Sequence, residues 1–221
     1  MRGSARAEVP RLATARLSLD PLSPEDAGEA YDAFADPQLY RYMVGEPPAS
    51  ADALRDEFAR LCAGSRDPAQ RWVNWLARTR DGGTLVGWQQ ATIVGPTAWI
   101  AWVTFPRHRQ TGYAREGASA VVGWLASLGI EEIVAQSDER NAASCATAAS
   151  LGFVPDPEPI AETLRGEATV DRVYRWRARQ APFRNDVGPC PSIEQGPDPG
   201  LRRGREGATP ASPRRPPRSR R

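Results

Sequence analysis

The stretch from residue 98 to residue 127 constrains the fold more than any other part of the chain. An apolar run, AWIAWVTF, ends at Pro106 and is followed by a polar turn, RHRQTG, and then by a strong helical pattern. This order predicts a strand, a tight turn and a helix that begins near residue 114. The first N–H groups of a helix have no partner within it, and the helix dipole adds positive potential there. The unit therefore predicts an anion-binding site at the start of this helix.

The patterns around this unit predict a mixed α+β layer fold. Alternation of apolar and polar residues indicates strands, and helix caps such as Ser23, Ser50 and Gly64 mark helix ends. The predicted elements are a strand over 14–22, helices over 23–36 and 50–64, a hairpin over 71–94, the strand 98–105, the helix 114–127, a strand over 131–137, a helix over 141–152, a short strand over 152–156 and a last strand over 168–178. Two early helices, an antiparallel meander and a strand–helix–strand–helix–strand series together indicate one sheet with helices packed on it.

Composition divides the chain into three parts. Residues 1–11 are predicted to be a flexible leader, residues 12–180 a single domain, and residues 181–221 a disordered tail rich in Pro, Gly and Arg. The tail contains nine Arg and four acidic residues, which makes it the source of the chain's positive net charge of +2. We interpret the tail as a solvated extension. Contact with RNA or ribosomes through phosphate groups is the alternative.

Charge and cysteine usage exclude several classes of protein. The 29 basic and 27 acidic residues nearly balance, which argues against a nucleic-acid-binding domain as the main body. One His and three Cys without paired spacing provide no metal framework. No run is long and apolar enough to span a bilayer. We expect a cytoplasmic protein, monomeric or homodimeric, with no metal and no membrane partner.

Three segments carry a family resemblance. Residues 109–114, RQTGYA, match the signature R/Q-x-x-G-x-G/A of the GNAT acetyltransferase superfamily, and residues 141–153, NAASCATAASLGF, resemble its N-x-x-S…L-G-F segment. The opening from residue 12, LATARLSLDPL, is similar to the T-x-R-L-x-L-R-P start of the RimJ/RimL-like branch, whose enzymes acetylate ribosomal-protein N-termini. The three motifs occur in the family's order over residues 12–177.

The resemblance implies a fold and an acyl donor. GNAT proteins have a mixed, mostly antiparallel sheet with helices on both faces and a splay between strands four and five, and they bind acetyl-CoA. Backbone N–H groups at the helix start would bind the pyrophosphate, and Gly112 would let the backbone approach closely because it has no Cβ. Strand four would pair with the pantetheine arm. The implied acetyl-CoA-binding residues are Val103, Thr104, Phe105, Arg109, Gln110, Thr111, Gly112, Tyr113, Ala114 and Asn141.

The implied reaction is direct transfer of an acetyl group from acetyl-CoA to an amine acceptor. By position, Asn141 would hold CoA or a water near the thioester, and Ser144 would protonate the departing thiolate. Each residue also has a structural interpretation. Asn141 suits a helix N-cap, and a Ser within a helix is commonly solvated or bonded back to the backbone.

The general base is not assigned by the resemblance. Many relatives carry a Glu early in strand four, where this chain has Trp99. Glu162, Glu167 and Asp171 near the last strand are alternative bases, and a water relay without a dedicated base is another. Because the strand-four Glu is absent, a non-catalytic acyl-CoA-binding sensor or interaction module of the same fold remains the alternative function.

Overall fold

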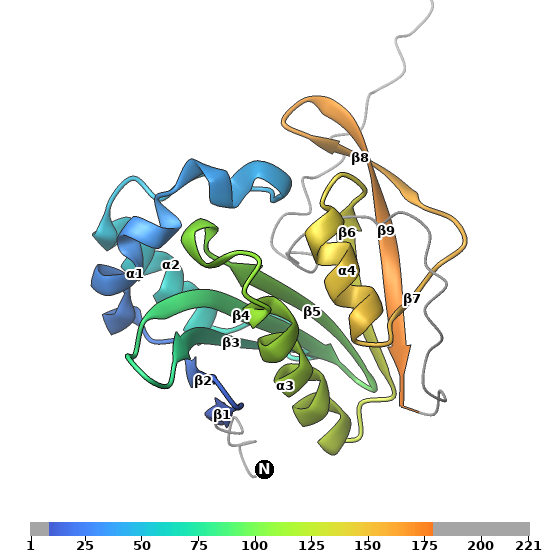
Figure 1. Cartoon of the computed structure of the whole chain (residues 1–221), viewed down its shortest axis with the longest axis horizontal. Helices are drawn as coiled ribbons and strands as arrows, with labels where there is room; N and C mark the ends of the chain where they lie inside the picture. The colour runs from blue at the N-terminus through green and yellow to red at the C-terminus, as the bar shows by residue number, and fades with distance from the viewer. Residues whose placement is uncertain (1–8, 179–221) are drawn as a thin grey trace, which may run out of the picture.

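The computed structural model describes residues 9–178, and over this range the chain forms one nine-stranded sheet with helices packed against it (Figure 1). The strand order is β1-β2-β3-β4-β5-β6-β9-β7, and β8 pairs with β9 outside this path. The strands are β1 (Leu12–Ala13), β2 (Leu17–Pro21), β3 (Gln70–Thr79), β4 (Leu85–Val94), β5 (Thr97–Thr104), β6 (Glu132–Asp138), β7 (Val154–Pro155), β8 (Ile160–Leu164) and β9 (Glu167–Arg177). The helices are η1 (Pro24–Asp26), α1 (Ala27–Phe34), η2 (Pro37–Tyr42), α2 (Ala51–Ala63), η3 (Pro106–His108), α3 (Tyr113–Ser127) and α4 (Ala142–Ser150).

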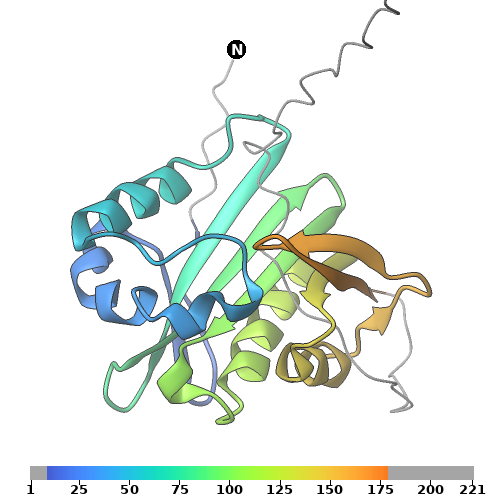
Figure 2. The same cartoon turned by 90° about the horizontal axis from the view of Figure 1, so that it is seen from above.

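The helices lie on both faces of the sheet (Figures 1 and 2). α3 and α4 cover one face, where Trp75, Ile100 and Val121 belong to one buried apolar cluster. α1 and α2 cover the other face of the N-terminal strands, where Phe34 and Trp88 belong to a second cluster. Because strand residues alternate between faces, β3, β4 and β5 supply both clusters. The sheet therefore has an α3/α4 face and an α1/α2 face.

The predicted caps begin and end the early helices. Ser50 Oγ accepts from the N–H of Ala53 at 3.1 Å, and Gly64 ends α2 with a φ of 74°. Ser23 caps the short helix η1 rather than a long α-helix, so the predicted helix over 23–36 is divided into η1 and α1. These caps satisfy backbone groups that the helices themselves leave unpaired.

β5 and β6 diverge along their length. They are parallel and pair at only three positions, the last of which joins Trp99 to Val134. Beyond this pair, residues 100–104 of β5 and 135–138 of β6 have no ladder between them, while β4 and β9 continue to pair on their outer sides. This is the splay that the family resemblance implies, and it leaves one backbone edge of β5 without a neighbouring strand.

Four short elements were not predicted from the sequence, β1, η2, η3 and β8. Of these, η2 contacts the turn after β8, since the Arg165 guanidinium in the β8–β9 turn donates to the carbonyl of Tyr40 in η2 at 2.6 Å. At the start of the chain, the Pro10 carbonyl accepts from Trp75 Nε1 at 2.8 Å, so ordered contacts begin within the leader predicted over 1–11. The tail predicted over 181–221 lies outside the described residues, among which no helix is long and apolar enough to cross a bilayer.

Candidate functional site

The turn before α3 presents a row of unused backbone donors. Gln110 and Gly112 both adopt left-handed backbone conformations, with φ of 62° and 84°. Within residues 9–178, no acceptor is bonded to the N–H groups of residues 110–114, and the first helical bond of the unit is donated by Glu116 to the Gly112 carbonyl at 3.1 Å. Gly112 is the N-cap of α3 and has no side chain to cap it. The turn is therefore built to receive an external anion.

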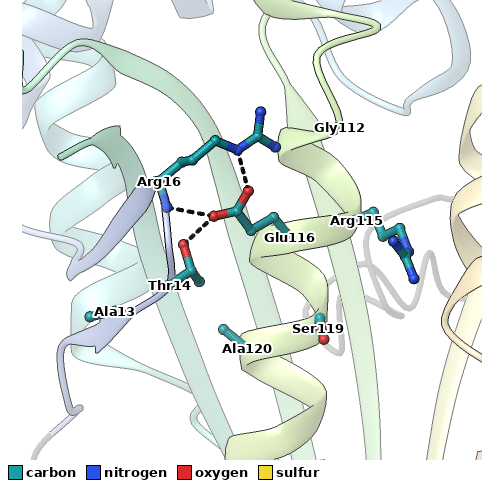
Figure 3. A pocket seen from close by; sticks show the side chains of 8 residues that line it. All are labelled: Ala13, Thr14, Arg16, Gly112, Arg115, Glu116, Ser119 and Ala120. Atoms are coloured by element: carbon teal, nitrogen blue, oxygen red, sulfur yellow. Dashed lines mark hydrogen bonds and ion pairs between the residues drawn. The ribbon is translucent and has the colours of Figure 1, made fainter. Parts of the chain in front are cut away.

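A side-chain brace holds this turn from below (Figure 3). The Glu116 carboxylate accepts from Thr14 Oγ1 at 2.6 Å, from the backbone N–H of Arg16 at 2.7 Å and from Arg16 Nε at 2.7 Å. Arg16 also donates to the Thr111 carbonyl at 3.0 Å, and its guanidinium carbon lies 4.8 Å from the centre of the Tyr113 ring. The start of β2 and the first turn of α3 are thus joined, which fixes the shape of the turn before α3.

The same brace keeps Glu116 ionised. Burial raises the pKa of this carboxyl, but the hydrogen bonds from Thr14 and Arg16 outweigh burial and hold the pKa below its ordinary value. A hollow of about 500 Å³ opens beside the brace, lined by Ala13, Thr14, Arg16, Gly112, Arg115, Glu116, Ser119 and Ala120 (Figure 3). Sequence reasoning missed the role of Arg16, although the T-x-R-L match at residues 14–17 pointed to this position.

The residues of the predicted signature differ in what they can offer. The Arg109 side chain donates to the Gln38 carbonyl at 2.9 Å, so its guanidinium is bonded to η2. Gln110 and Thr111 are exposed, and Ala114 packs against the α3/α4-face core. The turn can therefore bind an anion through its backbone rather than through a dedicated cation.

The splay carries two buried polar atoms without partners. Trp102 Nε1 on β5 and Ser137 Oγ on β6 have no hydrogen-bond partner among the described residues, and the two residues are 5% and 0% exposed. Each is three residues beyond the last β5–β6 pair, so they stand at the same level on opposite sides of the splay. Strand alternation places both on the α3/α4 face. A buried unpaired polar atom is costly, so this pair points to a polar ligand between the strands.

The predicted pantetheine strand is only partly available. Val103 and Thr104 belong to the diverging half of β5. Phe105 lies one residue beyond the strand, and its N–H donates to the Val86 carbonyl at 3.0 Å. The Phe105 N–H is therefore already used by β4. Backbone groups alternate between the two sides of an antiparallel strand, so those of Val103 also face β4, whose Gly87 lies against the Val103 carbonyl. Thr104 is left as the predicted residue suited to a paired ligand.

Asn141 and Ser144 lie together at the start of α4. Asn141 is the N-cap, and its side-chain oxygen accepts from the N–H of Ser144 at 3.3 Å. Ser144 stands in the first turn of the helix rather than in its middle, and no hydrogen bond to its Oγ occurs within the described residues. Asn141 follows β6 closely, since its N–H donates to the Asp138 carbonyl at 2.9 Å. Both residues are thus placed at the β6 side of the splay.

Two buried carboxyl groups pair across β6 and β9 on the opposite, α1/α2 face. Asp138 and Asp171 are direct partners in the strand register, and each residue is 1% exposed. Arg140 Nε donates to both oxygens of Asp138, at 2.7 and 3.0 Å, and the Arg140 backbone N–H donates to one of them at 2.9 Å. These bonds outweigh the effect of burial and hold the pKa of Asp138 below its ordinary value.

Asp171 has a different environment. Among the described residues its side chain accepts one hydrogen bond, from Gln136 Nε2 to Oδ2 at 3.3 Å. Burial together with the charges of Asp138 and Glu162 raises its pKa to about 6. Of the other bases considered from the sequence, Glu162 is half-buried on β8, and the Glu167 side chain is 80% exposed. No group of three or more His, Cys, Asp or Glu side chains within residues 9–178 could hold a metal ion.

Comparison with known proteins places this geometry in a family. The family model described as acetyltransferase (GNAT) domain matches residues 16–154. A GNAT-family acetyltransferase from Bacillus anthracis is 16% identical and has a TM-score of 0.64, covering 77% of this chain and 100% of its own. The ribosomal L7/L12 α-N-protein acetyltransferase RimL, solved with coenzyme A, is 16% identical with a TM-score of 0.67, covering 76% and 98%.

A variant of the spermidine N-acetyltransferase SpeG from Vibrio cholerae is also similar, at 17% identity and a TM-score of 0.58, covering 73% of this chain and 94% of its own. At these identities the structural matches show the fold alone. A comparison with curated proteins finds no match.

Proposed function

Because the chain belongs to the acetyltransferase (GNAT) family, we propose that it is an enzyme that moves the acetyl group of acetyl-CoA directly to a primary amine. Acetyl-CoA, when bound, supplies the thioester that the amine attacks. Direct transfer needs donor and acceptor in the site at the same time, and the splay has two faces from which they can approach. The donor would lie on the α3/α4 face and the acceptor on the α1/α2 face.

The observation that carries this proposal is that three features of the site suit successive parts of one elongated ligand. The unused N–H groups of residues 110–114 suit a pyrophosphate. The free edge of β5 around Thr104 suits a chain of amides. Trp102 Nε1 and Ser137 Oγ provide a polar donor and a hydroxyl where that chain would pass. Pyrophosphate followed by an amide-containing arm is the chemistry of coenzyme A.

The start of α4 is suited to the thioester end. The Asn141 side chain and the free Ser144 Oγ lie beside the splay. In the proposed reaction Asn141 positions the thioester or a water, and Ser144 gives a proton to the thiolate as the C–S bond breaks. A hydroxyl without another hydrogen-bond partner can turn toward the sulfur.

The identity of the acceptor is part of our proposal, because membership of the family does not specify it. Similarity to RimL and the T-x-R-L opening support the RimJ/RimL-like branch and therefore a protein N-terminus. Similarity to SpeG supports a small polyamine. Both are primary amines, and we propose this class, with the reaction taking place in the cytoplasm.

Binding and turnover test the proposal separately. Calorimetry should detect CoA binding to the purified protein, and thiol release from acetyl-CoA should depend on an added amine such as spermidine or a Ser- or Ala-initiated peptide. Absence of CoA binding would contradict the placement of the donor. CoA binding without amine-dependent thiol release would favour the alternative function, a sensor or interaction module of the same fold.

A further inference from the structure

Asp171 occupies an unusual position for a buried acid. Asp171 is 1% exposed, and its only side-chain hydrogen bond within residues 9–178 is with a neutral amide, that of Gln136, at 3.3 Å. The second oxygen, Oδ1, accepts from no group among the described residues. Buried charges in proteins are paired or strongly hydrogen-bonded. The neighbouring Asp138 meets this rule through Arg140, whereas no cationic group in the described part of the chain is bonded to Asp171.

The strand register places Asp171 at the level of the proposed acyl donor. Asp138 is four residues beyond the last β5–β6 pair on β6, and Val103 is four residues beyond it on β5. Parallel strands advance equally, so Asp138 stands opposite Val103 across the splay, and its partner Asp171 lies at the same level one strand further, on β9. The Asp138 carbonyl also accepts from the N–H of Asn141, so the acid pair lies directly before the start of α4.

The side chain of Asp171 lies on the α1/α2 face of the sheet. Ile133 and Ala135 of β6 belong to the core on the α3/α4 face, so Gln136 and Asp138 point to the α1/α2 face, as does Asp171. On β5 the same face carries Val103, which packs against the α1/α2 cluster. The Asp171 carboxyl therefore lies on the face from which the acceptor is proposed to approach.

We propose that Asp171 is the proton acceptor for the amine substrate, in place of the Glu that many relatives carry where this chain has Trp99. This assignment rests on the proposed function, since it assumes transfer to an amine. The amine enters as an ammonium ion, which supplies the cationic partner that the buried carboxylate lacks.

The proton balance of the step is complete with the groups at hand. One proton passes from R–NH3⁺ to Asp171, directly or across one water. The nitrogen lone pair forms the C–N bond, the C–S bond breaks, and nitrogen loses its second proton as the CoA thiolate gains one. Asp171 then returns its proton to solvent, so the products are the amide, the CoA thiol and one H⁺.

The charges around Asp171 suit it to this role. Asp138 on β6 and Glu162 on β8 raise its pKa, Arg140 after β6 lowers it, and burial has the largest effect, so that the pKa is about 6. Arg140 also lies 3.9 Å from Glu167 in the β8–β9 hairpin. A base with a pKa near the working pH is ionised when it is needed and still holds a proton well.

The test compares Asp171→Asn with two variants of its neighbours. With spermidine and Ser- and Ala-initiated peptides as acceptors, the wild-type kcat should fall below pH 6 as Asp171 is protonated. Asp171→Asn should lower kcat by about 100-fold or more and remove this acidic limb of the pH profile. The KM for acetyl-CoA should change less than about twofold, and the melting temperature at pH 8 should stay equal or rise. Asp138→Asn and Glu162→Gln remove charges that raise the pKa of Asp171, so each should move the limb to lower pH.

The outcomes separate the assignment from the function. If the Asp171→Asn variant kept wild-type turnover, the assignment alone would be overturned. The same holds if Glu162→Gln, rather than Asp171→Asn, abolished the fall of kcat at low pH. Carboxyl ¹³C titration of the wild type, with Asp171→Asn to identify the signal, should give a midpoint near 6, and a midpoint in the ordinary Asp range near 4 would also overturn it. A protein that binds CoA but acetylates none of these amines would overturn the proposed function, and the assignment with it.

Discussion

Replacing Gly112 with alanine tests whether the turn before α3 holds the phosphates of acetyl-CoA. At this position φ is 84°, and an added Cβ would lie 3.3 Å from the nearest Arg16 nitrogen, which is a tight contact. The left-handed conformation costs a non-glycine residue about 1–2 kcal/mol. For a domain of this size the melting temperature should fall by about 2–4 °C per kcal/mol. The new methyl group would also stand at the unused N–H groups, so CoA affinity should fall by about tenfold or more, or about 1.4 kcal/mol.

The matched control lies at the other end of the same helix. Gly129 follows α3 with a φ of 82°, and no heavy atom lies within 4 Å of an added Cβ. Gly129→Ala therefore adds the same backbone strain far from the turn, and it should lower the melting temperature similarly while leaving CoA affinity unchanged. The readouts are thermal unfolding without ligand and calorimetric titration with CoA. Equal CoA affinity in the two variants would refute the placement of the phosphates at this turn.

Three further predictions concern the brace, the α4 start and the tail. Glu116→Gln should destabilise the protein by about 1–3 kcal/mol at pH 7, because hydrogen bonds to a charged acceptor are lost. Because the pKa of Glu116 is lowered in the folded state, its contribution to the free energy of unfolding is full above the unfolded pKa near 4.3 and disappears as the pH falls through the folded pKa. Denaturant unfolding should therefore show a large difference in stability between wild type and Glu116→Gln at pH 7 and a small one at pH 3. Asn141→Ala should lose about 1 kcal/mol of stability with the N-cap as well as turnover, whereas Ser144→Ala should lose turnover alone, as melting and thiol-release assays will show. Deleting residues 181–221 should leave melting temperature and CoA affinity unchanged, with any loss confined to polyanion binding at low salt; a truncated protein that fails to fold would place the domain boundary further along the chain.

Much of the fold could be predicted because its signals are local. The turn at residues 107–112 precedes α3 as expected, and Ser50 and Gly64 bound α2 because capping depends on residues within one helical turn. β8 escaped prediction because a short strand with exposed residues has little periodicity, and it forms by pairing with β9.

The sequence by itself determined where a turn with unused N–H groups would lie, since Gly112 and the helix after it are adjacent in the chain and their geometry is local. It also pointed to an N-cap at Asn141 for the same reason. Only the tertiary structure decided that Arg16, about 100 residues away from Glu116, braces that turn. Likewise, only the tertiary structure decided that Asp138 and Asp171 are neighbours across β6 and β9 and that Arg140 donates hydrogen bonds to Asp138. Proton affinity depends on burial and on charges brought together by strand register, and neither quantity can be read from the order of residues along the chain.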